Sequence, residues 1–384
     1  MKVVYSFVSL IITSALMILN MALAQTHLTF SNFLINDGNA YNNRTNYQEN
    51  IHQSSVQLNH QWTFSDIVFT PYYEINVMRY SKNSDLNNLS HNIGLRSRYI
   101  SDKNTLSLIL AARLFDYKDP FVYYEVNRYS GTLRYEYDPD LFQHLEMSLL
   151  IQKDHYNEFD LLDNTVFEWK TAYQHFFPNR LGVTVRGHLG KKNYVNQKVV
   201  QFYGYVPGRF YTARYREDPV ETVQLSGSIN VAKSLLSYTG MNVMLGGQWF
   251  IGDPIKAYLD GMYYFTQNDL YDDPYAYQGY FWAVQLTQQF GVGFQAKAGY
   301  KWMRKDYAGT PALDEVGELT GETRLDTRRE FSFLLTKRWL TQWTWLSSLD
   351  LYLTYFYREN PSNDPYYDFK DNILMGGVAF TFKF

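Results

Sequence analysis

The sequence contains no cysteine among its 384 residues. Without thiols the chain has no disulfide framework and no thiolate metal site. After residue 24 it has no apolar run of about 18 residues, so nothing there predicts a membrane-spanning helix. The formal net charge is −3 and no basic tract is present. These absences exclude a disulfide scaffold and a later spanning helix, and we expect no nucleic-acid partner.

Motifs of known catalytic sites are also absent. The sequence has no G-x-S-x-G, no H-E-x-x-H, no Walker A motif and no EF-hand loop. Its eight histidines are scattered, and none is paired at the i, i+4 spacing that would place two ligands on one helix face. We therefore expect no enzymatic activity, no cofactor and no bound metal.

The N-terminus has the pattern of a secretory signal peptide. Met1-Lys2 gives a positive start, an apolar stretch extends from Val3 to Leu23, and Ala22-Leu23-Ala24 is a small-x-small cleavage site. We expect cleavage after Ala24. The predicted organisation is a signal peptide over residues 1–24 and one mature domain over residues 25–384.

What the mature chain does contain is strand patterning and aromatic residues. Aromatic side chains make up 18% of the sequence. Apolar and polar residues alternate with a period of two from beginning to end, which is typical of strands with two different faces. The clearest segments are Arg128–Asp138, His144–Asp154, Thr165–Phe177, Arg180–Gly190, Thr222–Ala232, Asn242–Ile251, Gly279–Phe290, Val292–Met303, Glu330–Trp339 and Leu349–Arg358. The pattern predicts one continuous antiparallel sheet.

The C-terminus ends on such a strand. A glycine precedes strict alternation that stops on an aromatic residue, in Gly377-Val378-Ala379-Phe380-Thr381-Phe382-Lys383-Phe384. This ending resembles the assembly signal of bacterial outer-membrane β-barrels, with Gly377, Phe380, Phe382 and Phe384 at the matching positions. The resemblance implies insertion into the outer membrane by the barrel-assembly machinery, with outer-membrane lipid and lipopolysaccharide as surroundings. We expect this strand to close the barrel against the strand that begins near His27.

A second resemblance covers the closing hairpin, from Arg358 through Asn360-Pro361-Ser362-Asn363-Asp364-Pro365-Tyr366 to Gly376-Gly377. It is similar to that of poorly characterised outer-membrane barrels. Some of those look like partners of polysaccharide-export systems, and others look like general porins.

Connection lengths predict the number of strands. Short joints, such as Pro178–Arg180 and Gly252–Lys256, alternate with longer polar ones, and bacterial barrels have an even strand count. Each connection can be assigned to one side of the membrane by counting strands from either end of the chain. The two counts agree if Arg209–Arg216 is a strand closed by a turn at Glu217-Asp218-Pro219. The predicted fold is all-β: a single transmembrane antiparallel up-and-down β-barrel of about 18 strands, or of about 16 if weak early segments are loops.

Alternation also assigns side chains to lipid or lumen. A charge on the lipid face costs roughly 2–4 kcal/mol for Arg or Lys. We therefore expect the charged residues of each strand at the alternate positions that face the lumen. The luminal candidates are Arg128, Arg134, Glu136, Glu168, Lys170, Arg186, Lys297, Lys301, Arg328, Glu330, Arg338, Asp350 and Arg358. Two interpretations stay open: mutual neutralisation of a water-filled interior, or selection of anionic or sugar-like solutes.

A barrel this wide is not filled by its own side chains. We expect Lys191–Gly208 to be a long loop, either folded inward as a constriction or lying outside as a cap. Tyr271-Asp272-Asp273-Pro274-Tyr275 is interpreted as a turn beside an aromatic girdle, with sugar contact as the alternative.

Three functional hypotheses follow. The first is a porin-type channel for passive passage of hydrophilic solutes. The second is a conduit that exports a surface polysaccharide together with a periplasmic export protein. The third is a non-transport barrel, either an adhesin or an assembly factor.

Overall fold

The structure is a computed structural model that describes residues 25–40, 44, 46–118, 125–158, 160–203, 214–252, 258–259, 262–263, 273–291, 293–343 and 345–384, with backbone alone for 161, 197–203, 214–219, 258–259 and 262–263. The predicted signal peptide, residues 1–24, lies outside the described residues, as does Val292.

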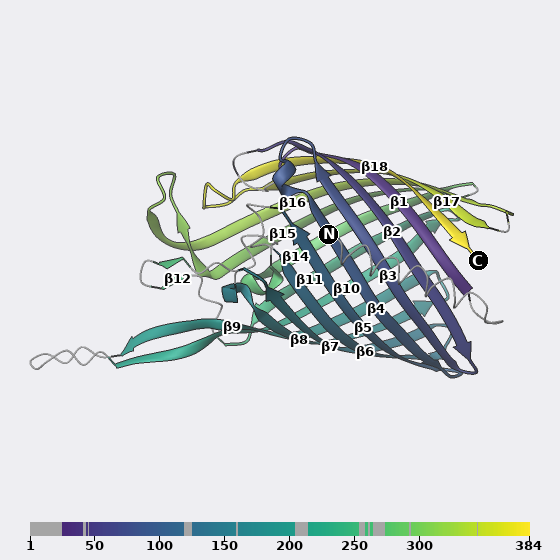
Figure 1. Ribbon diagram of the computed structural model, residues 1–384, viewed down its shortest axis with the longest axis horizontal. Helices are drawn as coiled ribbons and strands as arrows, with labels where there is room; N and C mark the ends of the chain where they lie inside the picture. Colours follow the sequence, from purple (N-terminus) through teal and green to yellow (C-terminus); the bar gives the residue numbers. More distant parts are fainter. Residues whose placement is uncertain are drawn as a thin grey trace, which may run out of the picture.

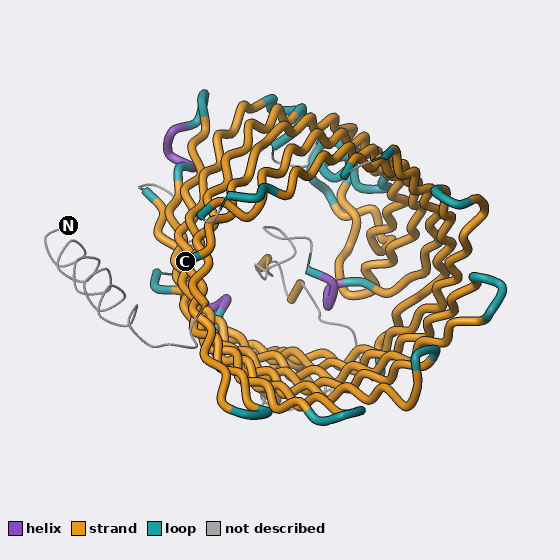
Figure 2. Tube along the Cα trace, turned by 90° about the vertical axis from the view of Figure 1, so that its right-hand side faces the viewer, coloured by secondary structure: helices purple, strands orange, loops and turns teal. Residues whose placement is uncertain are grey.

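Sixteen antiparallel strands form one closed barrel (Figures 1 and 2). Each strand pairs with its neighbours in the chain, and the first pairs with the last. The strands are β1 (Gln25–Asp37), β2 (Glu49–Phe64), β3 (Ile67–Tyr80), β4 (Asn88–Ile100), β5 (Asn104–Tyr117), β6 (Val126–Asp140), β7 (Gln143–Tyr156), β8 (Asn164–Phe177), β9 (Leu181–Tyr203), β10 (Arg214–Leu236), β11 (Thr239–Phe250), β14 (Gln278–Phe290), β15 (Phe294–Leu313), β16 (Leu319–Leu340), β17 (Leu346–Asn360) and β18 (Phe369–Lys383).

Short elements lie in the connections. These are the two-residue strands β12 (Tyr258–Leu259) and β13 (Met262–Tyr263), and the 3₁₀ turns η1 (Ser84–Leu86), η3 (Asp160–Leu162) and η4 (Pro274–Ala276). Among the described residues, no helix is both long and apolar enough to cross a membrane.

The seam between β1 and β18 closes the barrel as the sequence predicts. His27 pairs with Lys383, and the register continues without a shift to Asp37 and Ile373. Gly377 is required here for packing, because a Cβ at this position would lie 2.0 Å from Cδ1 of Phe33. The ring of Phe33 therefore packs directly over Gly377 on the strand opposite.

The predicted count of about 18 strands is wrong, and the alternative of 16 is confirmed. The early segments are all strands, so the difference arises in the middle of the chain. Arg214–Arg216 is the start of β10, and the predicted turn at Glu217-Asp218-Pro219 lies inside that strand. Pro219 cannot donate to a ladder, but the register shifts between Pro219 and Val220 and so accommodates it at an irregularity. The rest of the predicted strand, residues 209–213, lies outside the described residues.

Two predicted connections are also wrong. Lys191–Gly208 is not a loop, since residues 191–203 continue β9, and 204–208 lie outside the described residues. Both β9 and β10 are 23 residues long and extend past the rest of the wall as a two-stranded arm (Figure 1). The short joint predicted at Gly252–Lys256 is wrong, because the next barrel strand after β11 is β14. The described parts of this long connection do not pair with the strands of the barrel wall.

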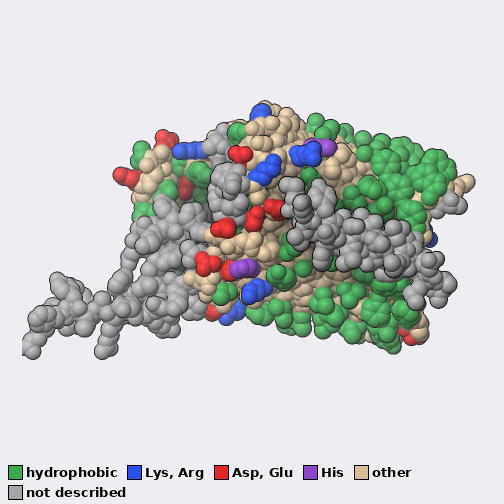
Figure 3. Space-filling view, viewed as in Figure 1, with side chains coloured by type: hydrophobic (Ala, Val, Ile, Leu, Met, Phe, Trp, Pro, Cys, Tyr) green, Lys and Arg blue, Asp and Glu red, His purple; other side chains and the backbone are tan. Residues whose placement is uncertain are grey.

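The two faces of the wall differ in chemistry. On β5, for example, Leu106, Leu108 and Leu110 are 44%, 44% and 46% exposed on the outside. On the face shown in Figure 3, apolar side chains gather toward the end where the C-terminus lies, and charged ones lie near the middle and toward the other end. The outer face is thus suited to lipid, whereas the ladder satisfies the backbone groups of the wall.

We expect Leu110→Arg to destabilise the barrel by about 2–4 kcal/mol, because it places a charge on the lipid face near mid-strand. Ile109→Arg, one residue away and on the luminal face, is the matched control and should cost much less. Urea unfolding in lipid vesicles measures both. Equal losses would contradict the assignment of faces.

Candidate luminal site

A segment of the β11–β14 connection folds into the barrel. Seen along the barrel, a short helical turn lies inside the ring of strands (Figure 2). This is η4, which begins after Asp273, whose Oδ1 accepts a hydrogen bond from the Tyr275 backbone N–H at 3.1 Å. Proline at the first position suits the turn because its missing N–H needs no partner there. We call residues 273–277 the infolded segment.

A buried ion pair holds the infolded segment to the wall. Lys192 on β9 donates from Nζ to Oδ2 of Asp273. The two residues are 1% and 5% exposed. The Lys192 ammonium also lies 5.0 Å from the ring centroid of Tyr194, a cation–π contact that offsets part of the cost of burying the charge. Because both charges are withdrawn from water, loss of either partner removes a compensating charge that water does not replace.

A tyrosine makes the second anchor. Tyr275 donates its hydroxyl hydrogen to Oε1 of Glu168 at 2.9 Å. Burial raises the pKa of the Tyr275 phenol, and the charge of Glu168 raises it further, so the phenol remains a donor. Room for the ring comes from Gly190, which pairs with Glu168 in the ladder. A Cβ on Gly190 would lie 2.1 Å from the Tyr275 hydroxyl oxygen, so the wall has a socket only because this residue is glycine.

Two glutamine side chains make the third anchor. Gln224 on β10 donates from Nε2 to the carbonyl oxygens of Pro274 and Tyr277, at 2.9 and 2.8 Å. Gln248 on β11 donates to the same two carbonyls, each at 2.9 Å. The side-chain amides thus satisfy backbone acceptors that a short turn leaves unpaired.

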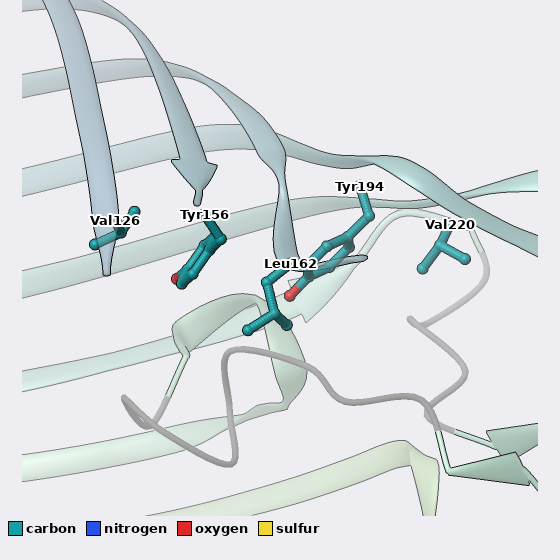
Figure 4. Close-up of a cluster of buried hydrophobic side chains, with 5 residues drawn as sticks. All are labelled: Val126, Tyr156, Leu162, Tyr194 and Val220. Carbon is teal, nitrogen blue, oxygen red and sulfur yellow. The ribbon is translucent and has the colours of Figure 1, made fainter. Parts of the chain in front are cut away.

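A small apolar cluster lies next to the Lys192–Asp273 ion pair. Val126, Tyr156, Leu162, Tyr194 and Val220 are buried together, each from a different element (Figure 4). Tyr194 belongs both to this cluster and to the surroundings of Lys192. The apolar cluster and the ion pair therefore meet at Tyr194, next to the infolded segment.

A pocket opens in the inner wall beside the infolded segment, which we call the wall pocket. Its volume is about 420 Å³, and its lining includes Lys170, Arg186, His188, Ser226, Ser228, Gln248 and Phe281. Small side chains on β10 and β11 make the hollow, and longer ones on β8 and β9 border it.

Most of the predicted luminal charges are found in pairs. Arg128 Nε lies 2.8 Å from Asp154 Oδ1, Arg134 Nε lies 3.2 Å from Glu146 Oε1, and Arg358 Nε lies 3.2 Å from Glu330 Oε1. The further contacts are Arg134 Nη1 to Glu136 Oε1 at 3.8 Å, Arg338 Nε to Asp350 Oδ1 at 2.5 Å, Lys170 to Glu168, Arg328 Nε to Asn360 Oδ1 at 3.3 Å, and Lys301 Nζ at 5.4 Å from the Phe281 ring centroid. These contacts favour mutual neutralisation for the paired residues, and a selectivity role remains a prediction.

Arg186 and Lys297 differ from the others, because neither side chain makes an ion pair or hydrogen bond to a described residue. Among the described residues no group of three His, Asp or Glu side chains is placed to hold a metal ion. The C-terminal signal residues lie on β18 or directly after it, and their role in assembly remains a prediction.

Sequence reasoning missed the anchor of the infolded segment. Asp273 and Tyr275 were interpreted as a turn and girdle, and Lys192 as part of a loop. A usable signal is Gly190, one of three glycines in β9, since a glycine inside a strand can mark a close approach of another segment. The partner that approaches could not be read from it.

A closed antiparallel barrel with an apolar outer face and a charged interior defines a bacterial outer-membrane β-barrel. Residues 249–382 match the family model described as surface lipoprotein assembly modifier. The matched stretch extends from the end of β11 to the end of β18 and includes the infolded segment. No curated protein matches the chain.

Solved structures show the same fold at low identity. They include OccAB1 of Acinetobacter baumannii (9% identity, 94% of this chain and 96% of that chain, TM-score 0.53) and OccAB2 of the same species (12%, 94% and 98%, TM-score 0.51). OprD of Pseudomonas aeruginosa is a third (10%, 94% and 95%, TM-score 0.50). The matched family and these neighbours are outer-membrane barrels, not enzymes.

We expect Asp273→Ala to release the infolded segment, since removing one partner of a buried pair costs about 3–5 kcal/mol. The chain has no cysteine, so Ser226→Cys gives a single thiol in the wall pocket. Its modification by a membrane-impermeant reagent should be roughly tenfold faster, or more, in the Asp273→Ala background.

Asp314→Ala is the matched control, because Asp314 caps an external turn by accepting from the backbone N–H groups of Val316 and Glu318. It should leave the modification rate unchanged. Equal rates in both backgrounds would show that Asp273 does not hold the segment.

Proposed function

We propose that this barrel assists the assembly of a lipoprotein at the bacterial surface. The observation that carries the proposal is the match of residues 249–382 to the surface lipoprotein assembly modifier family. This role belongs to the hypothesis of a non-transport assembly factor, and it replaces passive diffusion as the first choice.

The architecture is consistent with such a role. The matched stretch contributes five adjoining strands, β14 to β18, and the infolded segment that they flank. A polar inner wall provides hydrogen-bonding partners for a polypeptide, whose backbone groups are costly to bury in hydrocarbon. The wall already does this for the infolded segment through Gln224 and Gln248.

Passive passage of hydrophilic solutes is the second candidate. Arg186 and Lys297 favour it, because luminal cations without a carboxylate partner attract anions. Export of a surface polysaccharide has no support among the similar proteins named above, and we do not propose it.

Deletion of the gene tests the proposal. Intact cells with and without the barrel are treated with protease, and the released lipoprotein peptides are quantified by mass spectrometry. We expect particular lipoproteins to lose surface exposure while their total amount in the outer membrane stays the same. Complementation with the unaltered gene should restore exposure.

A parallel assay measures uptake of small hydrophilic solutes by the same two strains. Unchanged surface lipoproteins together with slower solute uptake would contradict the proposal and favour the channel.

A further inference from the structure

We propose that the wall pocket binds an acidic side chain of an extended polypeptide. The inference deepens the proposed function and rests on it, since it names what the inner wall recognises. It is argued from the ladder register around the infolded segment and from the charges in the pocket.

The wall pocket continues the surface that holds the infolded segment. Glu168, Gly190 and Gln224 face one another across β8, β9 and β10, and form the row that receives Tyr275 and the carbonyl groups. Two residues further along each strand, Lys170, His188 and Ser226 form the next row. Two residues beyond these, Ala172, Arg186 and Ser228 form the third. The second and third rows line the wall pocket.

The infolded segment shows how this wall binds a polypeptide. It offers an acidic side chain, Asp273, to a cation on β9, and it offers backbone carbonyls to side-chain amides. The wall pocket presents the same kind of donors further along: Arg186 on β9 for an acid, and the hydroxyl groups of Ser226 and Ser228 on β10. A second acidic segment would find matching chemistry there.

The charges of the pocket leave one cation for such a ligand. Glu146 is paired with Arg134, and Lys170 is paired with Glu168. His188 Nδ1 lies 3.2 Å from Ser226 Oγ. The Arg186 side chain is exposed in the lumen and makes no ion pair or hydrogen bond to a described residue. A guanidinium in this state binds a planar carboxylate through two parallel hydrogen bonds.

The shape of the wall pocket favours a side chain that belongs to a polypeptide. The third row continues from Ser228 to Gly246, so Arg186 stands among the small residues Ala172, Ser228 and Gly246. Phe281 closes one side of the pocket. Its ring packs over Gly246, because a Cβ on Gly246 would lie only 2.6 Å from Cζ of Phe281. Phe281 gives the pocket an apolar surface as well as polar ones, which suits the methylene of an acidic residue.

Binding of short peptides to the purified, refolded barrel in detergent tests the inference. The probes are acetyl-Ala-Asp-Ala-amide, the matched acetyl-Ala-Asn-Ala-amide, and acetate, each titrated by ligand-observed NMR. We expect the aspartate peptide to bind more tightly than the other two. Arg186→Gln should weaken it by roughly tenfold or more, since a hydrogen bond to a charged group contributes about 1.5–3 kcal/mol.

Arg113→Gln is the matched control. Arg113 lies in the same barrel, stacked 4.6 Å from the ring centroid of Phe115, but does not line the wall pocket. It should leave peptide affinity unchanged, and Arg186→Lys should retain part of it. Equal affinity for Arg186→Gln and the unaltered protein would overturn the inference, as would acetate binding as tightly as the aspartate peptide.

The two proposals fail separately. Arg186-dependent peptide binding with unaltered surface lipoproteins in the deletion strain would contradict the proposed function. Loss of surface lipoproteins on deletion, without Arg186-dependent binding, would contradict the wall-pocket assignment alone.

Discussion

The pairing of β1 with β18 is the interaction on which the rest of the structure depends. In hydrocarbon no water is present to satisfy a free strand edge, so a sheet can cross only as a closed ring. Once Phe30 pairs with Phe380 and the register is set, every residue is assigned to lipid or to lumen. The apolar outer face and the charged inner face are both consequences of that closure.

Closure leaves an interior that the wall alone does not fill, and this chain places a segment of its own inside it. The two sides of that contact come from different parts of the chain. Lys192, Glu168 and Gln224 precede the stretch that matches the surface lipoprotein assembly modifier family, whereas Asp273 and Tyr275 lie within it. The matched stretch therefore depends on the preceding strands for the position of its infolded segment.

The sequence was sufficient for fold class, the closing seam and the parity of faces, because each is recorded in local alternation. It failed where a local signal has two structural meanings. Pro219 indicates a turn or an irregular strand position, and only pairing with β9 distinguishes them. The ion pair that anchors the infolded segment could not be predicted for another reason. Lys192 and Asp273 are 81 residues apart, and no periodicity connects them. Alternation predicts which charges face the lumen, but their ion-pair partners lie on neighbouring strands and follow only from the register.

The central claim is that the infolded segment lies against the inner wall at β9 and β10. A photoreactive benzoylphenylalanine at Gln224, activated in intact outer membranes, tests it directly. We expect a crosslink to residues 273–277, identified by mass spectrometry, because Gln224 Nε2 lies 2.8 Å from the carbonyl oxygen of Tyr277. Crosslinks to other segments alone, with none to 273–277, would contradict it.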